Sequence, residues 1–133
     1  MNDHLKIIDV NFGELSLEDE STYFAEVPWK CGMSIRLFVD VDGKDHRRCL
    51  ERAWEVFSAV RKNEAELLHQ GIDDAGVDAE CINEFLDNEI VERNIQIFAD
   101  GEGHINYYLF GLGTFMIWFS RDAAYMKTLV IPC

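Results

Sequence analysis

The sequence predicts an α+β domain, in which a largely antiparallel sheet carries one long and one shorter helix packed on one face. Two observations predict this class. Alternating or β-branched apolar segments lie at both ends of the chain, and between them apolar residues recur with a helical period. The expected order is β-β-β-α-α-β-β-β-β. We expect one domain over residues 1–133, because this length is ordinary for a single domain.

The first part of the chain, residues 5–42, predicts three strands. LKIIDVNF is apolar and β-branched, STYFAEVPW follows the acidic turn LEDE, and MSIRLFVDV alternates between apolar and polar residues. The alternation in the third segment predicts one buried face made of Ile35, Leu37, Val39 and Val41.

The middle of the chain predicts two helices. A long helix is expected to begin at an Asp45 N-cap and to stop at Gly71. Its apolar stripe has one gap, at Glu64, and comprises Leu50, Ala53, Trp54, Phe57, Val60, Leu67 and Leu68. A shorter helix is expected to begin after Asp78, with a stripe of Ile82, Phe85, Leu86 and Ile90.

The last part of the chain predicts four strands. NIQIFAD and HINYYLFG flank the turn GEG, which indicates a hairpin. TFMIWFS is nearly all apolar, so we expect a central strand covered on both faces. YMKTLVIP, which ends in Pro132, is the fourth strand.

The net charge of the chain limits the classes of partner that it is expected to bind. The chain has 25 acidic and 12 basic residues, a net charge of -13, which disfavours nucleic acid and anionic membranes and suits a basic protein. The same charge is also compatible with a role in solubility alone. Residues 66–92 hold nine carboxylates and no Lys or Arg. The partner-binding residues predicted there are Asp73, Asp74, Asp78, Glu80, Glu84 and Asp87.

The residues that usually carry catalysis or bind metal are scattered. The four cysteines form no CxxC pair and the four histidines show no ligand spacing, so we expect free thiols, no metal and no cofactor. DVDGKD departs from the spacing of a calcium loop and instead indicates a turn followed by a helix cap. No secretion signal is evident, and YYLFGLGTFMIWF is shorter than the ~20 apolar residues of a membrane span. We therefore expect a cytoplasmic protein without catalytic residues.

The stretch IQIFADGEGHINYYLFGLGTFMIWFS follows a helix with an internal Trp and an acidic segment. This order resembles a family of small bacterial domains of unknown function, in which an I-x-I/F-x-x-DG strand precedes an aromatic strand and an apolar one. The resemblance covers residues 35–131. Such domains resemble the immunity proteins of polymorphic toxins, and the resemblance supplies no catalytic residue to carry over.

Together these observations predict a non-enzymatic immunity protein that neutralises a basic antibacterial toxin, for example a nuclease. The carboxylates of the acidic segment would occupy the cationic cleft in which the toxin binds phosphate. Two alternatives stay open. One is a small hydrolase or ligand-binding domain with a hidden pocket, and the other is an acidic mimic of nucleic acid.

Overall fold

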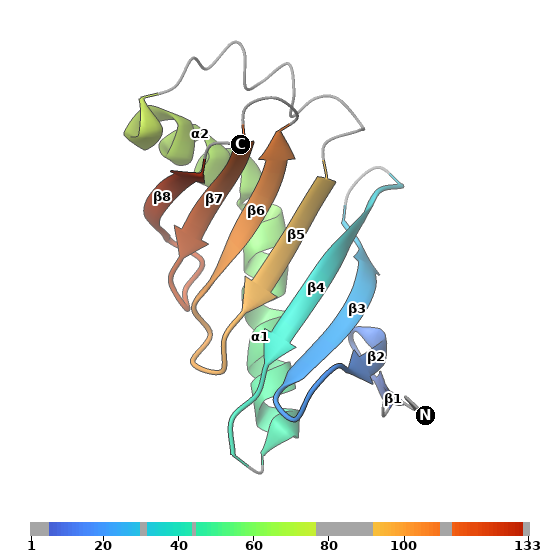
Figure 1. Ribbon diagram of the computed structural model, residues 1–133. Helices are drawn as coiled ribbons and strands as arrows, with labels where there is room; N and C mark the ends of the chain where they lie inside the picture. The colour runs from blue at the N-terminus through green and yellow to red at the C-terminus, as the bar shows by residue number, and fades with distance from the viewer. Residues whose placement is uncertain (1–5, 30–31, 44, 77–91, 110–112, 132–133) are drawn as a thin grey trace.

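A computed structural model describes residues 6–29, 32–43, 45–76, 92–109 and 113–131 (Figure 1). Eight strands form one sheet in sequence order, and every neighbouring pair is antiparallel except β4 and β5, which are parallel. The strands are β1 Lys6–Asp9, β2 Gly13–Leu17, β3 Thr22–Pro28, β4 Ser34–Asp40, β5 Glu92–Ile97, β6 Gly103–Leu109, β7 Gly113–Phe119 and β8 Tyr125–Ile131. The helices are α1 His46–Lys62 and α2 Glu64–Ala75.

The predicted α+β class is confirmed, with one strand more than expected before the helices. The segment predicted as a single first strand turns back on itself, because the Asp9 carboxylate accepts the backbone N–H groups of Asn11 and Phe12. Gly13 then begins β2 with a φ of 82°, which favours glycine. Only Leu15 of β2 is fully buried, so this short strand gives a weak apolar pattern in the sequence.

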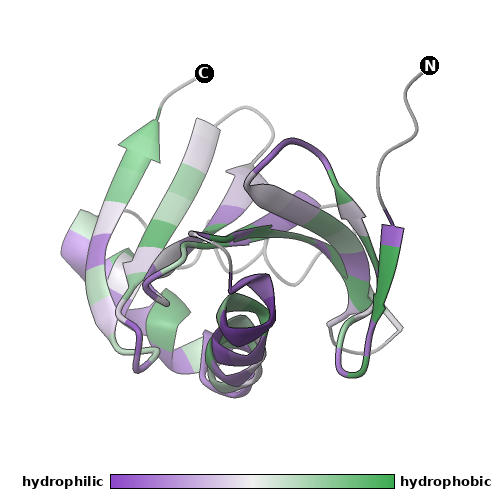
Figure 2. Cartoon of the chain, turned by 90° about the horizontal axis from the view of Figure 1, so that it is seen from below, coloured by the Kyte–Doolittle hydropathy of each residue, from purple (hydrophilic) through white to green (hydrophobic). Residues whose placement is uncertain are grey.

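Both helices lie on one face of the sheet, in the crossover that joins the parallel strands β4 and β5 (Figure 1). The sheet curves around α1, and green apolar positions alternate along its strands (Figure 2). The predicted face of β4 is confirmed, since Ile35, Leu37 and Val39 are at most 1% exposed against the helices. Among the described helices, none has both the length and the apolar character to cross a membrane.

The helical boundaries differ from the expected ones. The Asp45 cap is confirmed, because its carboxylate accepts the N–H of Arg48. The long helix breaks at Asn63, whereas the predicted stop at Gly71 is wrong. Gly71 lies inside α2, and the left-handed residue that ends α2 is Gly76, with a φ of 66°. The shorter helix predicted after Asp78 falls outside the described residues.

Gly71 allows close packing of α2 on the sheet and does not form a turn. A Cβ at this position would lie 2.9 Å from Ile117 Cδ1 and 3.0 Å from Thr128 Oγ1. The helix backbone therefore approaches β7 and β8 so closely that a Cβ at residue 71 would force Ile117 or Thr128 to shift. This contact fixes the distance between α2 and this end of the sheet.

The prediction that TFMIWFS forms a central strand covered on both faces is wrong. β7 lies second from the edge, and its side chains alternate. Phe115, Ile117 and Phe119 are buried beneath the helices, while Met116 and Trp118 on the other face are half-buried. Because the residues on both faces of β7 are large and apolar, this alternation of burial is not visible in the sequence.

We expect Gly71→Ala to destabilise the fold, although alanine is normally better than glycine in a helix by roughly 1 kcal/mol. The new methyl group would overlap Ile117, and overpacking typically costs about 1–3 kcal/mol. Urea unfolding measures the change. Adding Ile117→Val removes Cδ1, so the double variant should lose less than the sum of the two single losses. Strict additivity would contradict this packing account.

Candidate functional site

The structure places two of the six predicted partner-binding residues. Asp73 and Asp74 lie exposed in the last turn of α2. The Asp73 carboxylate is 3.9 Å from His69 Nε2, a contact that becomes an ion pair only when the imidazole is protonated. The other four predicted residues, Asp78, Glu80, Glu84 and Asp87, lie outside the described residues.

The position of Asp73 and Asp74 opposes the helix dipole. The last turn of α2 contains no basic residue, although the carboxyl end of a helix carries partial negative charge. A carboxylate there costs about 0.3–1 kcal/mol relative to a neutral side chain. Residues that break a rule of helix stability, as these carboxylates do at the negative end of the helix dipole, are candidates for a functional role.

The acidic end of α2 is joined to the edge strand β8. The Tyr125 hydroxyl donates to the Asp74 carboxylate at 2.7 Å and lies 2.7 Å from Thr128 Oγ1. Partial burial and the bond to Asp74 raise the pKa of Tyr125 above its ordinary value. The hydroxyl is therefore protonated at neutral pH and holds the carboxylate against the strand.

β8 also exposes apolar side chains on both of its faces, at 45–49% of their full area. These residues are Met126, Leu129, Val130 and Ile131. We call them, together with Asp73, Asp74 and Tyr125, the α2–β8 surface. Val130 lies on the face of β8 that α2 contacts, whereas Leu129 and Ile131 lie on the other face, so the acidic end of α2 adjoins an edge strand with exposed apolar residues on both sides. The sequence carries a signal for this surface, because YMKTLVIP has apolar residues at both odd and even positions and one charge, but that pattern alone predicts only a strand.

The first residue of α2, Glu64, is buried at 7% exposure and links α2 to β5, to β6 and to Trp29, the residue after β3. Its carboxylate accepts hydrogen bonds from Trp29 Nε1 at 3.0 Å and from the Tyr107 hydroxyl at 2.7 Å. Arg93 Nε of β5 lies 3.8 Å from the same carboxylate, and both side chains are about nine-tenths buried. The gap that Glu64 makes in the apolar stripe was the signal for this network, but a gap alone does not indicate burial.

The phenol of Tyr107, which belongs to this network, is neutral. Complete burial raises the pKa of this phenol well above its ordinary value, and the neighbouring Glu64 carboxylate adds to the shift. Tyr107 therefore stays a hydrogen-bond donor at neutral pH. The Arg93 guanidinium lies 5.6 Å from the centre of the Tyr107 ring, which adds a cation–π contact.

The face of the sheet opposite the helices carries a chain of polar side chains across β5 and β6. His104 Nδ1 lies 3.0 Å from Asn106 Oδ1, and Asn106 Nδ2 donates to Asn94 Oδ1 at 2.6 Å. Asn94 Nδ2 then donates to the Tyr108 hydroxyl at 2.8 Å. Because Asn106 Oδ1 can only accept, His104 Nδ1 carries a proton and Nε2 is the acceptor of the neutral ring.

His104 is held among aromatic rings rather than beside a nucleophile. Its ring centre lies 4.6 Å from that of Trp118 and 5.7 Å from that of Phe98. Burial lowers its pKa, while the bond to Asn106 and the charge of Asp40 oppose the shift. Within the described chain, Asn106 is the only side chain with which the imidazole forms a hydrogen bond.

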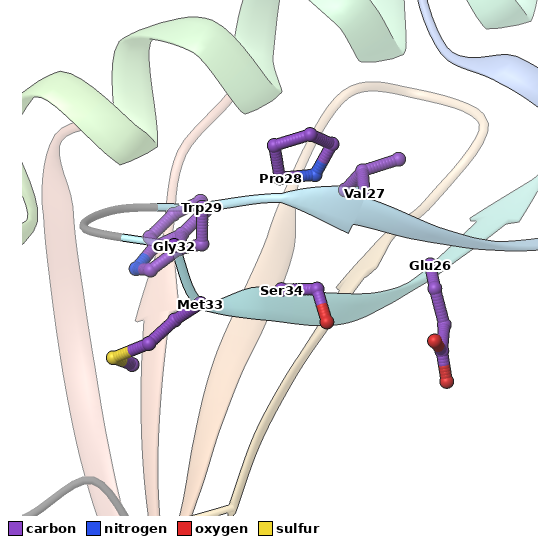
Figure 3. Close-up of a pocket in the computed structure, with 7 residues that line it drawn as sticks. All are labelled: Glu26, Val27, Pro28, Trp29, Gly32, Met33 and Ser34. Atoms are coloured by element: carbon purple, nitrogen blue, oxygen red, sulfur yellow. The ribbon is translucent and has the colours of Figure 1, made fainter.

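A shallow hollow of about 490 Å³ lies at the end of the β3–β4 hairpin. It is lined by Glu26, Val27, Pro28, Trp29, Gly32, Met33 and Ser34 (Figure 3). The side chains of Glu26 and Ser34 are the charged or hydroxyl groups in this lining, whereas a small-molecule site usually has several converging polar groups. No three His, Cys, Asp or Glu side chains among the placed residues are grouped to hold a metal ion.

No family model, no curated protein and no solved structure matches this chain. The resemblance to immunity-protein domains therefore stays a prediction.

We expect Glu64→Ala to destabilise the protein by about 3–5 kcal/mol, because Trp29 and Tyr107 lose their acceptor and Arg93 loses a buried countercharge. Chemical unfolding measures this loss. Glu66→Ala, two positions along the same helix and exposed, is the control and should cost less than about 0.5 kcal/mol. Equal losses in the two variants would show that the network contributes no stability.

We expect His104 to make stability fall as the pH drops. Because burial lowers its folded pKa below the ordinary 6.5, the unfolded chain binds more protons between the two values. The contribution is complete above the ordinary value and is lost as the pH falls toward the lowered one. His104→Gln should therefore reduce the slope of unfolding free energy as the pH falls below 6.5, by at most roughly 1.4 kcal/mol per pH unit. Identical slopes for the two proteins would contradict the burial of a neutral imidazole.

Proposed function

We propose that this chain is a non-enzymatic binding protein whose α2–β8 surface covers a cationic region of a basic protein. One observation carries the proposal. Asp73 and Asp74 are exposed at the end of α2 where the helix dipole disfavours them, without a basic residue in that turn. When a cationic partner binds, it offsets the unfavourable interaction between these carboxylates and the helix dipole. That interaction, present only in the free protein, therefore adds to the affinity.

The net charge of -13 supports the same partner class. An anionic field attracts a basic protein over distances longer than a contact and increases the rate of association at low salt. Asp78, Glu80, Glu84 and Asp87, which follow α2 in the sequence, are proposed as further contacts. They extend the carboxylates of α2 into a longer acidic segment.

The proposed partner is an antibacterial toxin, such as a nuclease, and this chain would be its cytoplasmic immunity protein. The resemblance of IQIFADGEGHINYYLFGLGTFMIWFS to domains like immunity proteins supports this choice. A nuclease also has a cationic cleft for phosphate, which the carboxylates would occupy. The exposed apolar residues of β8, the strand whose Tyr125 binds Asp74, favour one specific protein partner over general mimicry of nucleic acid.

The charge proposal predicts opposite changes in stability and in binding. Asp73→Asn should stabilise the free protein by about 0.3–1 kcal/mol, and Asp74→Asn should add less, because it weakens the hydrogen bond from the Tyr125 hydroxyl. The same pair should weaken the partner complex about tenfold or more at low salt, because two attractive contacts are lost. The partner is captured from an extract of the host that encodes this chain, identified by mass spectrometry and purified for titration calorimetry at roughly 0.05 and 0.3 M NaCl.

The matched control is Glu20→Gln with Glu55→Gln, which removes the same charge from exposed sites away from α2. This control should bind the partner nearly as tightly as the unchanged protein. A partner that is retained equally after the change at Asp73 and Asp74 would overturn the proposal. A purified partner that is acidic, or whose affinity does not change with salt, would overturn it as well.

A further inference from the structure

The two edges of the sheet are built differently. β1, at one edge, has four residues, two of which are the charged Lys6 and Asp9, and Lys6 forms an ion pair with Glu14 at 3.2 Å. β8, at the other edge, has seven residues with no proline and one charge, Lys127. Natural edge strands are usually short, charged or interrupted, since an open edge pairs with other chains. β1 has such protection and β8 does not.

The single charge of β8 does not shield its edge. Lys127 Nζ lies 5.0 Å from the centre of the Trp118 ring on β7, so the ammonium group lies over the sheet rather than beyond its edge. The apolar side chains of Leu129 and Ile131 lie on the same face as Lys127 and are nearly half exposed. Among the residues that the structure describes, no strand pairs with the outer side of β8.

We propose that β8 is a docking edge on which an extended segment of the basic partner adds as a further strand, and this rests on the function proposed above. The structure also indicates the pattern of that segment. Thr128 faces α2, because its hydroxyl lies close to Gly71 and to the Tyr125 hydroxyl that holds Asp74. Leu129 and Ile131 face the opposite way.

A segment that pairs with β8 alternates between the same two faces. Its side chains on the α2 side lie toward Asp73 and Asp74, so lysine or arginine is favoured there. Its side chains on the other side lie beside Leu129 and Ile131, so aliphatic residues are favoured there. The proposed ligand is therefore an extended peptide that alternates basic and apolar residues, held by backbone hydrogen bonds as in other cases of strand addition.

The test uses a synthetic peptide of the same length as β8 that alternates lysine with valine or leucine. Backbone amide resonances of the full chain are followed by NMR during titration, and the affinity is fitted from the shifts. We expect slowed amide exchange in β8. We also expect about tenfold or more weaker binding when alternate peptide nitrogens carry methyl groups, because the charge is unchanged and the backbone bonds are lost.

The variant Leu129→Lys with Ile131→Lys protects the edge and should weaken the same peptide by about tenfold or more. The matched control, Ile8→Lys with Val10→Lys, makes the same exchange at two residues that are 79% and 94% exposed near β1 and should bind like the unchanged protein. Folding of each variant is checked from its amide spectrum. Should Leu129→Lys with Ile131→Lys fail to fold, the methylated peptide tests the proposal on the unchanged chain.

Three outcomes would overturn strand addition. The first is that the methylated peptide binds as tightly as the unmodified one. The second is that the β8 variant and the β1 control bind the peptide equally. The third is that sedimentation shows a dimer of this chain, which Leu129→Lys with Ile131→Lys dissociates, because β8 would then already be occupied. Binding that stays sensitive to Asp73 and Asp74 but not to methylation would leave the proposed function intact. If the affinity for the natural partner did not change when Asp73 and Asp74 are neutralised, the proposed function itself would be overturned.

Discussion

The buried carboxylate of Glu64 is the interaction on which the arrangement of this protein depends. Glu64 is the first residue of α2, and it is bound by side chains that follow β3 or lie in β5 and β6. A carboxylate in a core is unfavourable unless its oxygens accept hydrogen bonds, so these contacts specify one position for the start of α2. The break between α1 and α2 lies at Asn63, the residue immediately before Glu64.

The other end of α2 is positioned by shape rather than charge. Gly71 allows the helix to lie against Ile117 and Thr128. With its start held by Glu64 and its middle held by this contact, α2 places its last turn beside β8. The carboxylates at that turn then lie beside the edge strand, on the face that Thr128 and Val130 share, while Leu129 and Ile131 lie on the other face. Protein stability and the proposed binding surface therefore depend on the same helix.

Several features of the fold were predictable because they depend on local patterns. The alternation in β4, the Asp45 cap and the hairpin between β5 and β6 each follow from a few adjacent residues. The sequence predictions are wrong where contacts between residues far apart in the chain determine the structure. Gly71 was interpreted as a stop because its packing partners lie about fifty residues away, and β7 was interpreted as two-sided because its outward side chains are also large. For the site, the charge of Asp73 and Asp74 was visible in the sequence, whereas their closeness to β8 required the fold.

The central claim is that the surface shared by α2 and β8 is where this protein meets its partner. Hydrogen–deuterium exchange on the complex with the purified basic partner tests this claim most directly. The account predicts slower exchange in the last turn of α2 and along β8, with little change at β1 and β2. Protection at β1 and β2, with α2 and β8 exchanging as in the free protein, would contradict it.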